Sequence, residues 1–314
     1  NKYEWVVRDV PRMYREPAMP ALHTVVQRVL VSTIPDWQTV SRWYADLCEK
    51  PLSDTTPGMT NTVRELTRNC SNDSEKIEAV FRYVSQKIRY MGITTEDTAP
   101  GYEPHPVSTT FENKYGVCRD KAALLAAMLR IAGFDAYPVL IYVGPKKDEE
   151  VPQPYFNHAI TCVRQEDGSY VLMDSTDETT RDLLPTYLGD KSYLVALPAG
   201  DTLRTSPVDP ADSNLVHITT TASLDGAGNM SAETTMQFEG INDNAYRTAL
   251  IRAKPTERRR LFERMIKKVV PGATLENFSL TPESLQDMTI PLRVQLNYTA
   301  KDILVEGDRT AMVP

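Results

Sequence analysis

Three residues of the types that combine in covalent catalysis occur in the chain order Cys118, His158 and Asp174. A thiolate can attack a carbonyl carbon, an imidazole can carry the proton, and a carboxylate can hold the imidazole in one tautomer. Together they would perform acyl transfer through a thioester. We therefore treat these three as the candidate catalytic residues.

The stretch around Cys118 is suited to this chemistry. Apolar residues recur at helical spacing from Ala122 to Ala132, with Gly133 at the C-terminal cap, which predicts a helix whose first turn holds Cys118. A helix N-terminus lowers the pKa of a thiol. We expect Gly116 to allow a tight turn that leaves the sulfur open. The alternative is a buried structural cysteine, which is the commoner role of a lone cysteine.

A predicted hairpin relates the other two candidates. The strands 156–164 and 169–174 are joined by the residues 166–168, and a three-residue loop with glycine third pairs Ile160 with Asp174. His158 and Asp174 are then diagonal neighbours on one face of the sheet. We expect this face to meet the Cys118 helix, with the imidazole between sulfur and carboxylate.

Developing negative charge on the substrate oxygen would be met by the Cys118 backbone N–H at the helix start. Gln86 and Tyr90, at the end of the preceding predicted helix, are candidate side-chain donors. His105 lies in a Pro-rich loop over 92–114 that is placed to wall a cleft, and it is more typical of a solvated residue than of a catalytic one.

Further elements follow from capping and periodicity. Asp36 predicts the start of one helix, a second is expected from about Thr60 to Cys70 after a Pro57-Gly58 break, and Asn72 with Glu75 forms a capping box for a third. Residues 136–143 predict a strand. The segment 176–210 is polar and Pro-rich, so we expect an arm that wraps the domain and ends in a linker.

The remainder predicts a β-rich domain with one helix. Strands are expected over 217–223 and 229–238 around a hairpin, and near 275–280 and 292–300. Pro255 opens a helix with an apolar face and a basic face. The basic face is expected to be solvated, a membrane or partner surface being the alternative.

We therefore predict an α+β chain with three parts: an extended lead-in over 1–35 with one strand, as the tail of a preceding β domain; a core over 36–205 with helices packed on an antiparallel sheet; and an incomplete accessory domain over 212–314. The chain starts at Asn1 and ends in a strand-like segment, so we expect a piece of a longer protein that lacks flanking domains. No signal peptide is visible.

Composition excludes several classes of partner. The net charge of −7 over 314 residues argues against nucleic acid. The longest apolar run, Ala122 to Leu129, is far shorter than a membrane-spanning helix, so no transmembrane segment is expected. The four cysteines form no metal-type pair, and Cys48 with Cys70 could bridge two helices or stay reduced. We expect no metal and no cofactor.

Five separated motifs carry a resemblance to a known family: Arg89 to Ile93, Gly101 to Pro104, Tyr115 to Ala122, Phe156 to Ile160, and Asp174 to Thr176. In this order they resemble the transglutaminase-like core of the papain-like cysteine superfamily, in particular a bacterial exported branch with flanking β-rich domains. Val117 departs from the usual aspartate and Ser175 from a common proline.

The resemblance implies a periplasmic or envelope-associated protein with a peptide or protein substrate. A peptidase or amidase acting on peptide or glutamine-type amides is the favoured function. One alternative is a non-catalytic peptide-binding or scaffold protein that retains the fold, and another is a protein-glutamine amine transferase.

Overall fold

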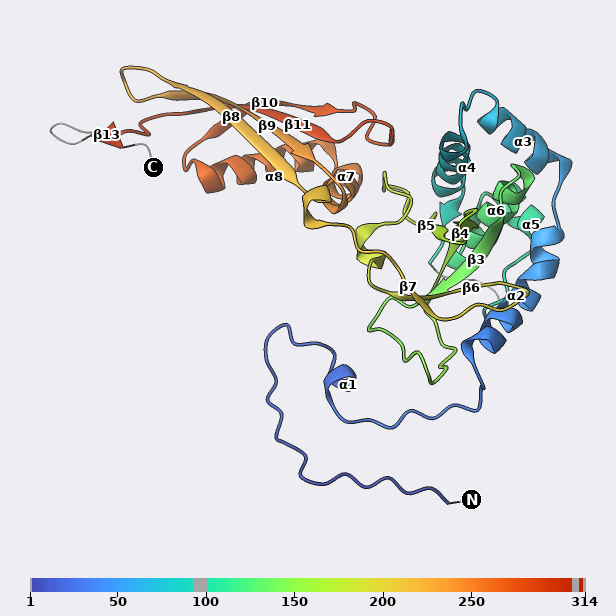
Figure 1. Cartoon of the computed structure of the whole chain (residues 1–314). Coiled ribbons are helices and arrows are strands. Elements are labelled where there is room, and N and C mark those ends of the chain that lie inside the picture. Colours follow the sequence, from blue (N-terminus) through green and yellow to red (C-terminus); the bar gives the residue numbers. More distant parts are fainter. Residues whose placement is uncertain (1, 93–100, 307–310, 313–314) are drawn as a thin grey trace.

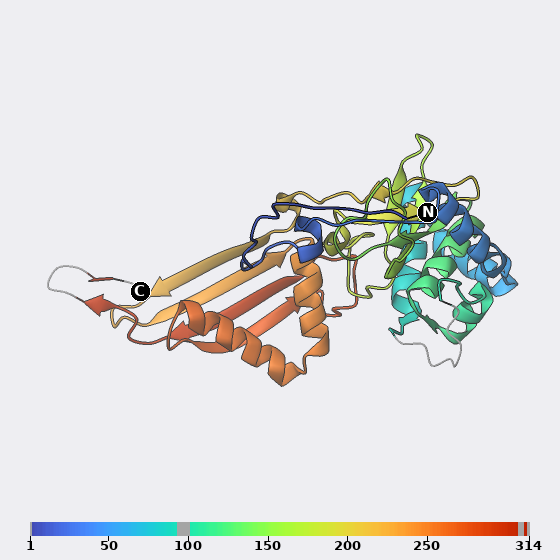
Figure 2. The same ribbon diagram turned by 90° about the horizontal axis from the view of Figure 1, so that it is seen from below.

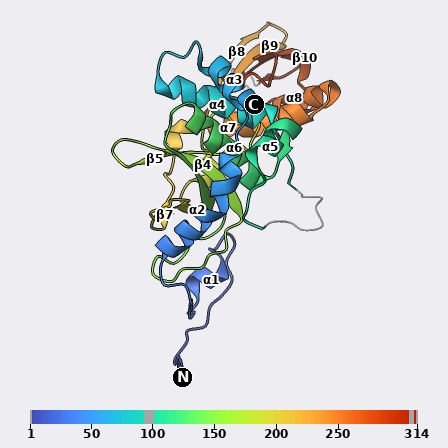
Figure 3. The same ribbon diagram turned by 90° about the vertical axis from the view of Figure 1, so that its right-hand side faces the viewer.

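Two folded units, called here the first core and the second core, are joined by a short connection near residue 210 (Figure 1); the first core has an apolar cluster on each face of its sheet, and the second has one cluster. The structure is a computed structural model that describes residues 2–92, 101–306 and 311–312. The N-terminal segment up to about residue 35 lies away from both cores in two views (Figures 1 and 3). It contains the short helix α1 (Leu22–Val25) and, among its described residues, no strand, so the strand expected there is wrong.

The helices of the first core are α2 (Trp37–Ser53), α3 (Pro57–Thr67), α4 (Asp73–Lys87), α5 (Val107–Asn113) and α6 (Cys118–Ile131). The predicted caps are confirmed: the Asp36 carboxylate accepts from the Thr39 N–H at 2.7 Å, and Asn72 accepts from the Glu75 N–H at 2.9 Å. Pro57 occupies the first turn of α3, so the expected break is the start of this helix. Helix α5 lies within the expected loop, whose residues 93–100 fall outside the described ones.

A five-stranded antiparallel sheet in the order β5-β4-β3-β6-β7 completes the first core. Its strands are β3 (Ala136–Ile141), β4 (His158–Arg164), β5 (Tyr170–Met173), β6 (Ser192–Val195) and β7 (Arg204–Thr205). Strand β6 is buried throughout and pairs with β3, so the segment expected as an arm and linker also supplies an interior strand. The turn η1 (Thr186–Leu188) packs through Leu188 on one sheet face, and α6 packs on the other.

The predicted hairpin register is confirmed. The pairs run from Arg164 with Tyr170 to Thr161 with Met173, which is the register of a three-residue loop. Gly168 holds the left-handed conformation at φ +83°, as the bulge requires. This register places His158 and Asp174 on the same side of the sheet.

The second core packs two helices on one face of a four-stranded antiparallel sheet (Figure 2). The sheet order is β10-β11-β9-β8, with β8 (Val216–Leu224), β9 (Met230–Phe238), β10 (Thr274–Thr281) and β11 (Arg293–Ala300). The helices are α7 (Ile241–Arg252) and α8 (Pro255–Val269), so the expectation of one helix is wrong. The smaller elements are β1 (Arg89–Tyr90), β2 (Tyr115–Gly116), η2 (Ala211–Ser213), β12 (Val305–Glu306) and β13 (Ala311–Met312).

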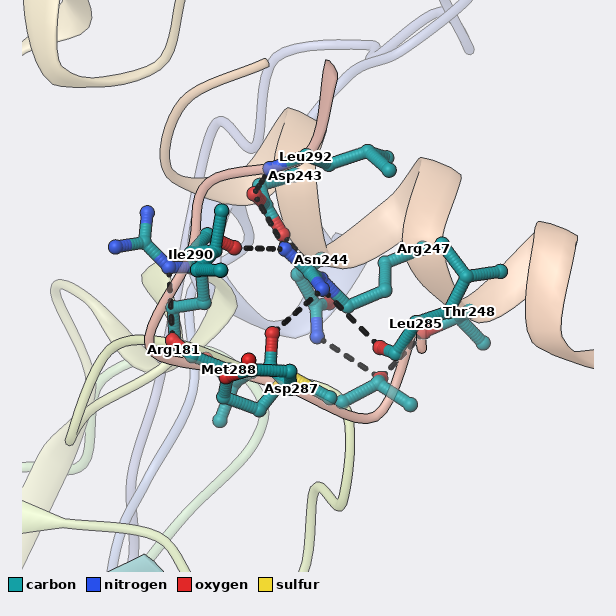
Figure 4. Close-up of polar contacts among 12 residues, drawn as sticks. Arg181, Asp243, Asn244, Arg247, Thr248, Leu285, Asp287, Met288, Ile290 and Leu292 are labelled. Atoms are coloured by element: carbon teal, nitrogen blue, oxygen red, sulfur yellow. Dashed lines mark hydrogen bonds and ion pairs between the residues drawn. The ribbon is translucent and has the colours of Figure 1, made fainter. Parts of the chain in front are cut away.

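Polar groups join the two cores (Figure 4). The fully buried Arg247 of α7 binds Asp243 through two hydrogen bonds of 2.7 and 3.0 Å. Its guanidinium also donates to the carbonyls of Leu285, Asp287 and Ile290. The loop that it shapes contacts the first core, where Arg181 donates to the Met288 carbonyl at 3.0 Å.

Within the part of the chain that the structure describes, no helix has both the length and the apolar character needed to cross a bilayer.

Candidate active site

Cys118 is the first residue of α6. The Asp120 carboxylate accepts from the Val117 N–H at 3.0 Å and so closes the first turn of the helix. A Cβ on Gly116 would lie 2.8 Å from the Asp120 Cβ and 3.1 Å from a Thr110 methyl group. Glycine is therefore required here because side chains of α5 and α6 approach its Cα closely.

His158 and Asp174 meet at the end of the sheet. The His158 Nε2 atom lies 2.8 Å from an Asp174 carboxylate oxygen, and the Asp174 carboxyl group is fully buried. Asp174 directly follows β5, and its N–H donates to the Leu183 carbonyl at 2.7 Å. Because Nε2 faces the carboxylate, Nδ1 is the ring nitrogen left to interact with the Cys118 thiol.

The face that carries these two residues differs from the expected one. Ile160 and Cys162 share the side of His158 and belong to the apolar cluster on the sheet face away from α6, whereas Thr161 donates to the Ala122 carbonyl of α6 at 2.9 Å. The body of the helix thus covers the opposite face. Cys118 reaches His158 because both are the first residues of their elements and lie at the same end of the sheet.

The surroundings favour an ion pair between sulfur and imidazole. Burial raises the pKa of Cys118, but the hydrogen bond and the charge of His158, with the N–H groups of Ala159 and Arg119, outweigh burial and lower it. Burial lowers the pKa of His158, but the hydrogen bonds to Asp174 and Cys118 raise it overall. The pKa of Asp174 is also set by opposing effects. Burial raises it, but the hydrogen bond and the charge of His158 outweigh burial, so the pKa is lowered overall.

Asp174 is held by partners that sequence reasoning missed. Its second oxygen accepts from the N–H and the hydroxyl of Thr176 at 2.9 and 2.7 Å, and the Tyr187 hydroxyl donates to the oxygen shared with His158 at 3.3 Å. The Asp-x-Thr spacing was an available signal for the first contact, because the same turn recurs at Asp177 and at Asp287. Tyr187 is a long-range contact with no local signal.

The two oxyanion candidates differ in position. Tyr90 lies near Cys118 and Asp174, whose charges add to burial in raising the pKa of its phenol, so the phenol stays a neutral donor. The Gln86 amide donates to the Gln286 carbonyl of the second core at 3.0 Å. Gln86 is thus committed to the contact between the cores, which corrects the expectation that its side chain serves the sulfur.

Two further side chains support the start of α6. The backbone N–H and the ring Nδ1 of His105 both lie 3.0 Å from an Asp120 oxygen, so His105 packs beside the cysteine helix with its side chain partly exposed. Lys121 is fully buried and donates to the carbonyls of Ser85 and Ile88 at the end of α4. Burial lowers its pKa to about 8. These contacts fix α4 and α6 relative to each other.

The described residues contain no group of three or more His, Cys, Asp or Glu side chains arranged to hold a metal ion. All four cysteines are free thiols in this structure, so Cys48 and Cys70 do not form the bridge that the sequence left open.

Part of this chain is similar to a known protein family. The family model described as the transglutaminase-like superfamily matches residues 60–175, which include Cys118, His158 and Asp174. No curated protein matches the chain.

Two solved structures are similar to the chain. One is described as "a putative protease from Parabacteroides distasonis", with 13% identity, a TM-score of 0.43, and coverage of 86% of this chain and 54% of that one. The other is "a putative cysteine protease from Cytophaga hutchinsonii", with 20% identity, a TM-score of 0.30, and coverage of 41% and 38%. The chain thus spans about half the length of the first and less of the second. The similarity to the transglutaminase-like superfamily thus covers residues 60–175, the part of the chain that holds the three candidate catalytic residues.

Proposed function

We propose that this protein is a cysteine hydrolase that cleaves peptide or glutamine-type amide bonds through a thioester. The observation that supports this best is the 2.8 Å contact between His158 and Asp174 beside a thiol whose pKa is lowered. A buried cysteine with a purely structural role would have a raised pKa, whereas the partners of Cys118 lower its pKa.

The chemistry follows from the positions of these atoms. The Cys118 thiolate attacks the carbonyl carbon, and the tetrahedral oxyanion is met by backbone N–H groups at the start of α6 and by the Tyr90 phenol. As the C–N bond breaks, the His158 imidazolium gives its Nδ1 proton to the leaving amine. A water molecule, deprotonated by His158, then attacks the thioester and releases the acid and the Cys118 thiolate. Asp174 keeps Nε2 protonated throughout.

The substrate class and the location are parts of the same proposal. Hydrolysis is preferred over amine transfer on the basis of the resemblance. The envelope location that the resemblance implies would supply extracytoplasmic peptides as substrates.

The test is alkylation by iodoacetamide between pH 5 and 9, located on each cysteine by peptide mapping. Iodoacetamide reacts with the thiolate, so we expect Cys118 to react rapidly well below pH ~8.5 and to slow only as the pH falls through its lowered pKa. The partly exposed Cys70 is the internal reference.

The His158→Ala variant is the matched comparison. It removes the group that lowers the pKa and leaves burial in place, so the midpoint of Cys118 labelling should move to higher pH. Two results would contradict the proposal of a hydrolase: slow labelling of Cys118 below pH 8 in the wild type, or an unchanged midpoint in the variant. Either result would favour the non-catalytic peptide-binding protein.

A further inference from the structure

A polar cavity of about 560 Å³ lies between the two cores, next to the candidate active site. The first core contributes β1, the loop after Asp174 and Tyr187. The second contributes one face of α7, on which Asn244, Thr248 and Ile251 follow at helical spacing, with Arg252 at the end of the helix. The second core therefore forms part of the wall.

The cavity adjoins the catalytic carboxylate. Thr176 and Tyr187 line it, and both donate hydrogen bonds to Asp174. Tyr90 also lines it and lies close enough to Cys118 for the two groups to interact electrostatically. A substrate bound at the sulfur can thus extend a neighbouring group into this space.

The two acidic residues of the cavity are already engaged. Asp177 accepts from Thr179 through one oxygen and from the Asn244 amide through the other, at 2.9 and 2.8 Å. Glu178 accepts from the Tyr90 N–H at 3.0 Å and lies near the buried Lys121 cation. These carboxylates hold the walls in place.

The two arginines of the cavity are not engaged. Arg89, from β1, and Arg252, from α7, both line the cavity, and neither guanidinium has a hydrogen bond or ion pair with another described residue. Each presents several N–H donors of the kind that binds carboxylates in pairs.

We infer that this cavity is a substrate subsite for a carboxylate, bound by Arg89 from the first core and Arg252 from the second. The inference rests on the proposed function, and it specifies the substrate as a peptide that carries a carboxylate beside the attacked bond. The carboxylate is that of an acidic side chain or that of the peptide's own C-terminus. The second core then selects substrates.

The test measures binding, by NMR titration, of three probes to the full chain carrying Cys118→Ala, which cannot turn them over. The probes are acetyl-Ala-Glu-Ala-amide, acetyl-Ala-Ala-Ala with a free C-terminus, and the neutral acetyl-Ala-Gln-Ala-amide. We expect one acidic probe to bind about tenfold more tightly than the neutral one, because a charge-assisted pair adds that much. Which acid binds more tightly identifies the source of the carboxylate.

Substitution of the arginines gives the decisive comparison. Arg252→Gln and Arg89→Gln should each reduce the preference for the acid, and Arg252→Lys should restore part of it. Arg264→Gln, on the exposed face of α8 outside the cavity, makes the same change in charge and should leave the preference intact.

Equal binding of all three probes, or a preference that survives both substitutions, would overturn the subsite. This readout does not depend on thiol reactivity. An inert Cys118 in the alkylation experiment would therefore refute the hydrolase without deciding the binding result.

Discussion

At the scale of single residues, burial alone makes a thiol less acidic, and two of the cysteines show this effect. Burial raises the pKa of Cys48 to about 12, and it raises that of Cys162 as well. Cys118 is also largely enclosed, but its neighbour His158 reverses the direction of the shift. The reversal depends on Asp174, because its buried carboxylate is the first partner that raises the pKa of His158 against burial.

We therefore expect Asp174→Asn to lower turnover by about 10²–10⁴-fold with little change in KM. An amide can donate to Nε2 and favour the tautomer that cannot serve the sulfur, while the substrate contacts stay in place. The measurement is steady-state kinetics on an acetylated peptide amide. Tyr187→Phe, which removes only the 3.3 Å hydrogen bond to the same carboxylate, is the control and should cost less than about tenfold. A similar loss of turnover in both variants would show that Asp174 does not act by fixing the His158 tautomer.

At the scale of elements, the hairpin between β4 and β5 brings His158 to the Asp174 carboxylate. Its register could be predicted because a three-residue loop ending in glycine leaves one pairing. The position of α6 relative to the sheet could not be derived from this register. Side-chain alternation says which residues share a face, but not which face the next element covers, and α6 covers the one opposite to His158.

Two missed elements show where local patterns fail. Strand β6 is short and buried on both faces, so its four residues show no alternation of apolar and polar side chains. Helix α7 buries Asp243 and Arg247, so charged residues occupy positions where an amphipathic pattern has apolar ones. In both cases the stabilising contacts come from residues distant in the sequence.

The glycine of the hairpin loop allows a test at this scale. Gly168→Ala should lower the free energy of unfolding by about 1 kcal/mol, because an L-residue pays a conformational cost at φ +83° although the added Cβ meets open space. Gly226→Ala, in the hairpin between β8 and β9, also adds a methyl group to open space but needs no positive φ, and it should be close to neutral. Urea unfolding measures both. Equal stability of the two variants would contradict a left-handed conformation of Gly168 in the loop between β4 and β5.

At the scale of the whole molecule, the contact between the two cores is polar and rests on loops. Arg247 shapes the loop that receives Arg181 (Figure 4), and α7 contacts residues 177–179 through Asn244. The Asn244 amide donates to Asp177 at 2.8 Å and to the Thr179 hydroxyl at 3.2 Å. Polar interfaces of this kind permit relative motion of domains. The second core thus donates hydrogen bonds to the loop that also carries Thr176, whose N–H and hydroxyl bind the Asp174 carboxylate.

We expect Asn244→Ala to loosen this loop without unfolding either core. The substitution removes both hydrogen bonds to the loop, and hydrogen bonds to a charged partner contribute about 1.5–3 kcal/mol locally. Amide hydrogen exchange should become faster over 176–182, while the strands of both sheets keep their protection. Asn297→Ala is the matched control, because its amide bonds Asn277 on the exposed sheet of the second core, away from the interface. Unchanged exchange over 176–182, or equal acceleration in the control, would show that the loop is held by the first core alone. Acceleration confined to Asn244→Ala would instead make the second core a support for Asp174, and turnover should then fall several-fold in that variant with Cys118 labelling preserved.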